Sequence, residues 1–554
     1  MKKSTKFIFI LILIPFIFKG EDFSYAYDKL FLYKASISEQ IQSKLDELAV
    51  TPGIMIGGER LHNIEYVTNL YRKNNYLPFW TKWDYTEDAI AGILSSYDDG
   101  LIPLDYHLEA ILVIRNQLIL DTIVNVDKIR QAAGLELLIT DGIIFYANHL
   151  LYGKIDPVTL VPTWNFGYAP IPDMVPATLQ EYLQKRELMT QLHNLRPEAF
   201  FYDTLLSTLS RYRKIESQGG WNVVPTGGKI EVGKNDPRIP LIRNRLRLTG
   251  HLTSEEDSSS TLYDKVLEED VRIFQATHGL DPDGVIGTGT FREFNIPVKQ
   301  RIASIRVNLE RVRWVALELP RNYLIVNIVG FWLVFVNGEM VIHDANVVVG
   351  RAYTKTPVFR DKIHYIEFNP TWTVPRSILK RDIIPKLKKD PEYLYKNSMV
   401  LLDSKGNEVP SSVLDIPNLT INTFPYIVRQ QPGPGNALGV VKFMFPNKYD
   451  VYLHDTPSKN LFKSPSRAYS SGCVRVERPL DLAELLLAGT SWDRAKIDKA
   501  LKTNQTTRVL LKDPLDILIL YWTSGVDRNH RPFFTPDIYN RDQFVLKELD
   551  RLLR

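Results

Sequence analysis

The sequence predicts a multidomain α+β protein in which helical regions precede a β-rich region. Three observations support this fold class. Apolar residues recur at helical spacing through most of residues 27–220, a short unit at 236–297 alternates helical stretches with glycine-containing turns, and from Tyr323 onward apolar residues alternate with the period of β-strands. With 554 residues, 44% of them hydrophobic and 24% charged, the chain can bury two or three separate cores.

The charge balance and the histidine pattern narrow the classes of partner. The formal net charge is +4 and no dense basic run is present, which argues against a nucleic-acid partner. The histidines of the helical region are scattered without the spacing of metal ligands, so we expect no metal site. These are His62, His107, His149 and His193.

The first 26 residues have the three parts of a secretory signal peptide. Lysines at positions 2, 3 and 6 precede an apolar run from Phe7 to Phe18, and the segment ends in Ser24-Tyr25-Ala26. The apolar run is shorter than the roughly 20 residues that a bilayer span needs. We therefore expect export and no membrane span after signal removal, with an uncleaved N-terminal anchor as the alternative.

The regions that follow divide by pattern into a helical region and a compact helical unit. Amphipathic helices are expected at Ile37–Leu48, Ile64–Asn75 and Ala132–Tyr152 within residues 27–220. The glycine-rich and polar composition of residues 214–234 predicts a linker. In the unit at 236–297, glycines at 279, 284 and 287 separate short helices with tight turns.

A β-rich region is expected at residues 320–514. Strands are predicted at Tyr323–Val329, Phe331–Val336 and Met340–Val349, and Asn337-Gly338 is a strong two-residue hairpin signal between the last two. A charged, helical insertion at about 376–419 interrupts the strands. A C-terminal segment, residues 515–554, follows the last predicted strand and is expected to end in a helix.

The candidate reactive group is Cys473, the only cysteine of the chain. An exported protein with one cysteine can form no internal disulfide, so a reactive thiol is favoured. His454 precedes it by a short loop and Arg475 follows two residues later. A thiol is mostly protonated at neutral pH, and a neighbouring imidazole or positive charge can promote the reactive thiolate. The competing interpretation is a small buried hydrophobic residue beside an unrelated histidine.

The residues around the thiol fit attack on a carbonyl group. Gly472 leaves room for a substrate carbonyl and frees local backbone N–H groups to form an oxyanion hole. In a strand, Tyr452 and His454 point to one face and their apolar neighbours to the other. Ser471 is expected to form hydrogen bonds near the nucleophile, with a purely structural role in the turn as the alternative.

Five motifs follow one another through the β-rich region: Val349-Gly350 with Thr356-Pro357, Asn369-Pro-Thr-Trp-Thr-Val-Pro375, Lys442-Phe-Met-Phe-Pro-Asn447, His454-Asp-Thr-Pro-Ser-Lys459 and Ser470-Ser-Gly-Cys-Val-Arg475. In this order they resemble the motifs of the L,D-transpeptidases with a YkuD-type catalytic domain, specifically their long, multidomain periplasmic subclass. One departure is that the shorter members usually have His immediately before Gly-Cys. This chain has Ser471 there, so a role of that second histidine does not carry over.

The resemblance extends to the other regions of the chain. Residues 27–220 resemble the scaffold domain of the subclass, and Phe274-Gln275, His278-Gly-Leu280 and Asp283-Gly-Val-Ile-Gly287 resemble a three-helix peptidoglycan-binding module at 236–297. The insertion at 376–419 corresponds to one that caps the substrate cleft. Expected partners are peptidoglycan stem peptides and glycan, together with penicillin-binding or other wall enzymes.

The resemblance implies a cysteine acyl-enzyme that crosslinks third-position residues of stem peptides in the periplasm, without metal or organic cofactor. It implies catalytic roles for Cys473, His454 and backbone N–H groups of the 471–473 loop, and inactivation by carbapenems. Arg475 is expected either to orient a substrate carboxylate or to stabilise the loop. Tyr452 and Trp372 are expected to line the cleft, with packing as an equal alternative for Trp372. A cysteine carboxypeptidase or endopeptidase and a non-catalytic wall-binding scaffold remain the alternative functions.

Overall fold

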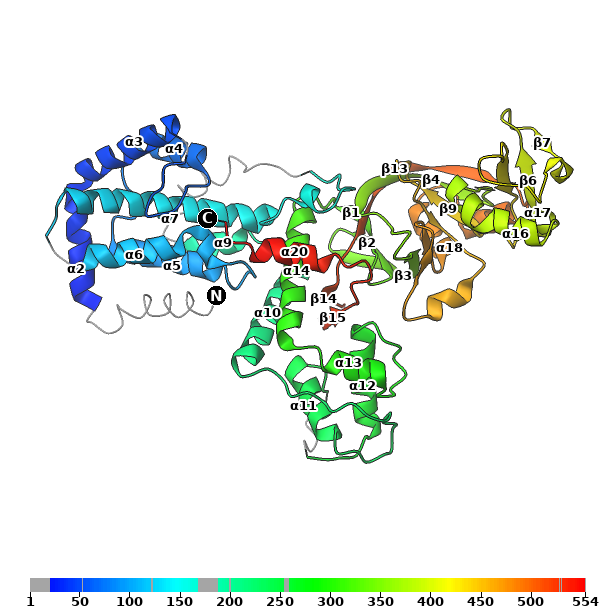
Figure 1. Cartoon of the computed structure of the whole chain (residues 1–554), viewed down its shortest axis with the longest axis horizontal. Helices are drawn as coiled ribbons and strands as arrows, with labels where there is room; N and C mark the ends of the chain where they lie inside the picture. The colour runs from blue at the N-terminus through cyan, green and yellow to red at the C-terminus, as the bar shows by residue number, and fades with distance from the viewer. Residues whose placement is uncertain are drawn as a thin grey trace.

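The computed structural model describes residues 20–51, 53–120, 123–167, 188–198, 201–253, 259–527, 529 and 531–553. Most of the predicted signal peptide, residues 1–19, lies outside them. The molecule is elongated: a helical domain occupies one end, the β-rich domain and its insertion the other, and a small helical module projects from the middle (Figure 1). This arrangement confirms the predicted fold class.

The helical domain is built around α7 (Val126–Tyr152), a helix of 27 residues. Its middle is buried on nearly every side because α3, α5 and α6 pack around it. Asn125 caps its start by accepting a hydrogen bond from the Lys128 backbone N–H at 2.9 Å. The other helices are α2 (Gly20–Leu30), η1 (Phe31–Tyr33), α3 (Lys34–Val50), α4 (Ile64–Lys73), α5 (Trp83–Ser95), η2 (Pro103–Tyr106), α6 (Leu108–Ile119), η3 (Pro157–Thr159), α9 (Leu188–Asn194) and α10 (Tyr202–Ser217).

The projecting module has its own apolar core and three helices, α11 (Ile239–Thr249), α12 (Lys265–Thr277) and α13 (Thr288–Phe294). Gln275 holds the glycine turn that follows α12: its side chain accepts from Gly284 N at 2.9 Å and donates to the Asp283 carboxylate at 3.1 Å. These two polar side chains therefore stabilise the turn. The long helix α14 (Val298–Ala316) continues from the module into the centre of the molecule.

The β-rich domain contains a nine-stranded mixed sheet in the order β11-β3-β12-β10-β9-β4-β13-β1-β2. Because β2 also pairs with β3, eight of these strands form a closed ring, which β11 extends beside β3. The strands are β1 (Asn322–Asn327), β2 (Trp332–Asn337), β3 (Met340–Gly350), β4 (Phe359–Phe368), β9 (Val441–Met444), β10 (Leu453–His454), β11 (Ala468–Ser470), β12 (Val474–Val476) and β13 (Thr507–Leu520).

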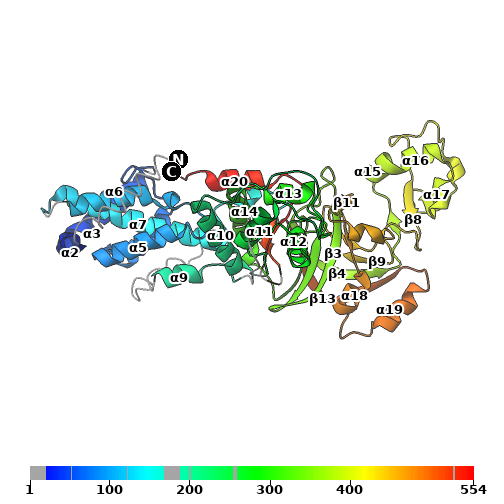
Figure 2. The same ribbon diagram turned by 90° about the horizontal axis from the view of Figure 1, so that it is seen from below.

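The insertion contains a four-stranded sheet in addition to the expected helices, in the order β5-β8-β6-β7, and it has a separate core. It lies at the far end of the molecule, next to the strands that carry the candidate site (Figure 2). Its elements are β5 (Trp372–Thr373), α15 (Arg376–Ile378), η4 (Leu379–Ile383), α16 (Ile384–Lys389), α17 (Tyr393–Lys396), β6 (Met399–Leu402), β7 (Glu408–Val409), η5 (Ser411–Val413) and β8 (Ile427–Gln430).

The chain then returns from the sheet to the helical domain. Strand β13 runs through the predicted boundary at residues 514 and 515, and its register shifts between Leu510 and Leu515. The C-terminal helix α20 lies beside α14, and the Leu553 N–H donates to the Asp105 carboxylate at 2.9 Å. The remaining elements are η6 (Lys459–Lys463), α18 (Pro479–Leu486), α19 (Arg494–Leu501), β14 (Ser524–Val526), β15 (Pro532–Phe534) and α20 (Asp542–Asp550).

Candidate active site

Three neighbouring strands carry the candidate catalytic residues. Strands β10 and β12 run parallel, with Leu453 opposite Val474 and His454 opposite Arg475, while β9 places Lys442 opposite His454 on the other side. Cys473 is the last residue before β12, next to Tyr452 in this register. The parallel pairing therefore brings the predicted thiol, imidazole and guanidinium to one edge of the sheet.

Cys473 is half-buried, and its Sγ lies 3.5 Å from the carbonyl oxygen of Asp450. Burial raises the pKa of the thiol, while hydrogen bonding with Tyr452 and the positive charge of Lys442 act in the opposite direction. The net direction is upward, so the thiol is protonated at neutral pH. Attack on a carbonyl therefore requires a base that removes this proton.

His454 is the candidate for this base. It is buried, and its Nδ1 lies 2.5 Å from the Asp455 carbonyl oxygen. A carbonyl only accepts hydrogen bonds, so Nδ1 carries the proton of the neutral ring and Nε2 is its unprotonated nitrogen. The backbone carbonyls of Asp455 and Leu438 both act on the ring and favour its protonated form. Burial first, and then the positive charge of Arg475, lower the pKa of His454 to about 3. The imidazole is therefore neutral at neutral pH.

No hydrogen bond joins the Cys473 thiol to His454 within the part of the chain that the structure describes. Tyr452 lies between them: its ring contacts the His454 ring edge to face at 5.6 Å between centroids, and it acts on the thiol by lowering the pKa of Cys473. Lys442 Nζ lies 4.2 Å from the centre of the same tyrosine ring. Tyr452 is thus a central residue of the site, and Trp372 on β5 is a second hydrogen-bond partner of it.

The loop before the nucleophile is held by its own side chains. Ser470 Oγ accepts from the Gly472 N–H at 3.0 Å and donates to the Cys473 carbonyl at 2.5 Å. Gly472 has a φ of +127°, which favours glycine, and a Cβ there would face open space. The Cys473 N–H has no acceptor among the described residues, so it is available as a donor to a substrate oxyanion.

Ser471 faces the insertion instead of the thiol. It is exposed, and its hydroxyl accepts from Arg381 Nη2 at 2.7 Å, which ties the insertion to the nucleophile loop. Arg475 lies two residues from Cys473, and among the described residues the charged groups that act on its pKa are Arg351 and Cys473, not a carboxylate. Its Nε is buried without a hydrogen-bond partner, and burial and the nearby Arg351 lower its pKa. An unpaired guanidinium next to the thiol can bind a substrate carboxylate.

Several residues of the site were not predicted as functional from the sequence. Lys442, Thr356 and Tyr539 lie in strands or loops far from Cys473 in sequence, although Lys442 and Thr356 fall within quoted motifs. Asp450 contributes through its carbonyl oxygen, which any residue type could supply. Across the described ranges, no group of three or more His, Cys, Asp or Glu side chains could hold a metal ion.

The closed β-sheet thus brings together a thiol, a neutral imidazole and a backbone N–H that has no acceptor among the described residues. Three family models match the chain. They are an L,D-transpeptidase catalytic domain (YkuD) at residues 321–497, a scaffold domain at 65–209 and a "Putative peptidoglycan binding domain" at 235–293. The chain thus combines the YkuD L,D-transpeptidase catalytic domain with a scaffold domain and a peptidoglycan-binding domain, which confirms the resemblance.

One relative has a name that agrees with these matches. A Haemophilus influenzae protein named "Putative L,D-transpeptidase" is 34% identical over 256 residues, covering 46% of this chain and 50% of that protein, so the match spans about half the length of the relative. A crystal structure of the L,D-transpeptidase (residues 123–326) from Xylanimonas cellulosilytica shares 13% identity and covers 53% of this chain and 99% of that one. Its TM-score is 0.18, which is too low to support a shared fold.

Proposed function

We propose that the protein is a cell-wall L,D-transpeptidase that links third-position residues of two peptidoglycan stem peptides through a thioester on Cys473. The observation that carries this proposal is the nucleophile loop: Cys473 lies next to Tyr452, whose ring contacts the buried, neutral His454, and the Cys473 N–H has no acceptor among the described residues. The matched catalytic and peptidoglycan-binding domains support the reaction class and the polymer.

In the first half-reaction, the thiol transfers its proton to His454 Nε2 as Sγ attacks the carbonyl carbon of the third residue, a meso-diaminopimelate or a similar residue. The tetrahedral oxyanion accepts a hydrogen bond from the Cys473 N–H. As the intermediate collapses, the C–N bond breaks and D-Ala leaves with the proton held by the imidazolium. Without substrate, the thiol points to the Asp450 carbonyl and not to His454. A hydrogen bond between a nucleophile and its base often forms only when substrate is bound.

In the second half-reaction, the side-chain amine of another stem peptide attacks the thioester. His454 takes a proton from the amine, and the thiolate leaves and regains a proton. The C–S bond is exchanged for an amide bond, so the energy of the original D-Ala bond is conserved and no cofactor is required. Arg475 either binds a carboxylate of the donor or stabilises the loop; its unpaired guanidinium favours the first role.

The test is mass spectrometry of products after incubation with a disaccharide tetrapeptide, comparing wild type with Cys473→Ala. Dimers that lack one D-Ala, formed only by the wild type, are expected. Tripeptide without dimers would identify a cysteine carboxypeptidase or endopeptidase, which passes the same acyl-enzyme to water. Equal binding of both proteins to sacculi, with no thiol-dependent product, would leave the wall-binding scaffold as the function.

The proposed function also has consequences for the protein's cellular location and for its inhibition by carbapenems. We expect the predicted signal peptide to direct the protein to the periplasm, where its module at 236–297 would bind the wall and its activity would contribute to cell shape. No helix among the described residues is long and apolar enough to cross a membrane. A carbapenem offers a strained lactam carbonyl to Cys473, so we expect a covalent adduct that increases the mass of the wild type and leaves Cys473→Ala unchanged.

A further inference from the structure

The C-terminal segment contributes a buried tyrosine to the surroundings of the nucleophile loop. Tyr539 lies 42 residues beyond position 497, where the match to the catalytic-domain model ends. Its side chain is 3% exposed, and its hydroxyl donates to the Gly350 carbonyl at 2.6 Å and accepts from the Thr356 N–H at 3.2 Å. The hydroxyl thus joins the end of β3 to the following turn.

Thr356 continues this set of hydrogen bonds to the loop. Its buried hydroxyl accepts from the Gly350 N–H at 2.9 Å and donates to the Gly472 carbonyl at 2.8 Å. The turn is crowded: a Cβ on Gly350 would lie 2.0 Å from the Thr354 carbonyl oxygen. Two hydrogen bonds to one hydroxyl, in a turn with no spare room, fix the direction in which Thr356 holds the Gly472 carbonyl.

The orientation of that carbonyl also sets the orientation of the candidate oxyanion donor. The peptide bond between Gly472 and Cys473 is planar and trans, so its C=O and N–H point in opposite directions. Holding the Gly472 oxygen toward Thr356 therefore directs the Cys473 N–H, which has no acceptor among the described residues, to the opposite side of the loop. Displacement of such a donor by a fraction of an ångström weakens its bond to the oxyanion.

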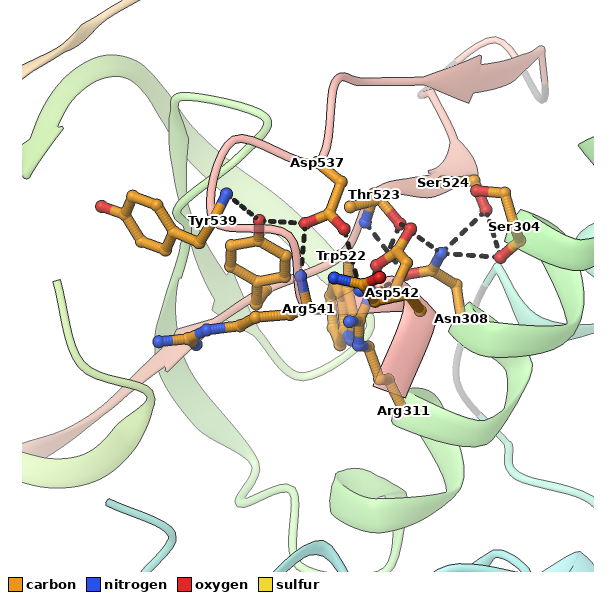
Figure 3. Close-up of polar contacts among 12 residues, drawn as sticks. Ser304, Asn308, Arg311, Trp522, Thr523, Ser524, Asp537, Tyr539, Arg541 and Asp542 are labelled. Carbon is orange, nitrogen blue, oxygen red and sulfur yellow. Dashed lines mark hydrogen bonds and ion pairs between the residues drawn. The ribbon is translucent and has the colours of Figure 1, made fainter. Parts of the chain in front are cut away.

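Tyr539 is in turn held in place by the polar cluster shown in Figure 3. The Tyr539 N–H donates to the Tyr521 hydroxyl at 2.8 Å, and that hydroxyl donates to the Asp537 carboxylate at 2.5 Å. Asp537 also accepts from the backbone N–H of Asp542 at 2.8 Å. Asp542 forms an ion pair with Arg311 of α14 at 2.7 Å, which anchors the cluster to the central helix.

We propose that Tyr539 and Thr356 are positioning residues, which orient the Cys473 N–H toward the oxyanion formed in acyl transfer. The inference rests on the proposed role of Cys473 as an acyl-accepting nucleophile. It assigns to the C-terminal segment, which lies outside the three matched domains, a part in building the oxyanion hole.

The test compares two reactions of the same thiol. Acylation by p-nitrophenyl acetate passes through a tetrahedral oxyanion, whereas alkylation by iodoacetamide does not. Tyr539→Phe and Thr356→Val should slow acylation by roughly 10- to 100-fold and leave alkylation within about twofold of wild type. Thr356→Ser retains the hydroxyl and should restore acylation. Tyr146→Phe, which removes a buried hydroxyl bonded to Asp99 at 2.7 Å in the scaffold, should change neither reaction.

Two outcomes would overturn the inference: acylation at the wild-type rate in Tyr539→Phe and Thr356→Val, or an equal loss of acylation and alkylation, which indicates general disruption of the loop. The proposed function is judged separately with the tetrapeptide donor. A wild-type protein that reacts with p-nitrophenyl acetate through Cys473 but forms no peptide product would contradict the transpeptidase proposal. The ratio of acylation to alkylation would still decide the role of Tyr539.

Discussion

The depressed pKa of His454 makes a specific prediction for the pH dependence of acylation. If the neutral imidazole removes the thiol proton during attack, the rate follows the fraction of enzyme with neutral His454 and protonated Cys473. Burial and Arg475 lower the pKa of His454 to about 3, and burial raises the pKa of Cys473. Both groups therefore keep the required protonation states from mildly acidic to neutral pH.

The magnitude follows from the two pKa values. With an ordinary histidine pKa of about 6.5, the neutral fraction would fall from about 0.9 at pH 7.5 to about 0.1 at pH 5.5, a tenfold loss of rate. With a pKa of about 3, His454 remains more than about 99% neutral over the same interval. We therefore expect the acylation rate to change by less than about twofold between these pH values.

The assay is single-turnover acylation of the protein by p-nitrophenyl acetate, followed from pH 5.5 to 7.5 at constant ionic strength and corrected for uncatalysed hydrolysis. Cys473→Ala is the blank. A tenfold fall on acidification would mean that His454 titrates as an exposed imidazole, contrary to the burial described here. A hundredfold fall would mean that a free thiolate attacks without a base, since its population drops tenfold per pH unit.

Three further predictions concern the surroundings of the site and the scaffold. Lys442→Met should raise the pKa of the thiol and slow its alkylation at pH 8 by roughly 3- to 10-fold, whereas Lys496→Met, which removes a lysine of α19 from the ring of Trp492, should have no effect. Arg381→Met should accelerate hydrogen exchange of the 470–473 loop, measured by mass spectrometry, without changing exchange in the sheet, because it removes a hydrogen bond between the insertion and the loop. His107 lies between two carboxylates that raise its pKa from 6.5 to about 9, so it contributes about 3 kcal/mol of stability below pH 6.5 that is lost as the pH rises through 9. Urea unfolding at pH 6 and pH 10 should show this loss in wild type and in His193→Gln, and His107→Gln should lack it.

The hairpin of the catalytic sheet could be predicted because its signals are local. Alternating apolar residues and Asn337-Gly338 define the hairpin, and β2 and β3 pair antiparallel on either side of that turn. The placement of Cys473 beside the strand that contains His454 follows from the parallel pairing of β10 and β12. Motif spacing was sufficient to suggest both residues.

Other features depend on contacts that no local pattern reveals. Thr356 reaches Gly472 across 116 residues, and Tyr539 reaches Thr356 across 183 residues. The end of β13 was placed too early because Asp513 and Pro514 interrupt its alternation, and the structure accommodates them at a register shift within the strand. The sheet of the insertion was missed because its strands have only two to four residues, which is too short for a periodic signal.

The division of the apolar core indicates which parts of the protein act as one body. A single cluster of buried residues runs from Tyr27 in the scaffold to Leu549 in α20 and includes the catalytic sheet. The peptidoglycan-binding module and the insertion each have a separate core. Units with separate cores can shift against their neighbours at lower cost than parts of a shared core. The module and the insertion can therefore shift while the scaffold, α14 and the C-terminal segment hold the nucleophile loop in one geometry.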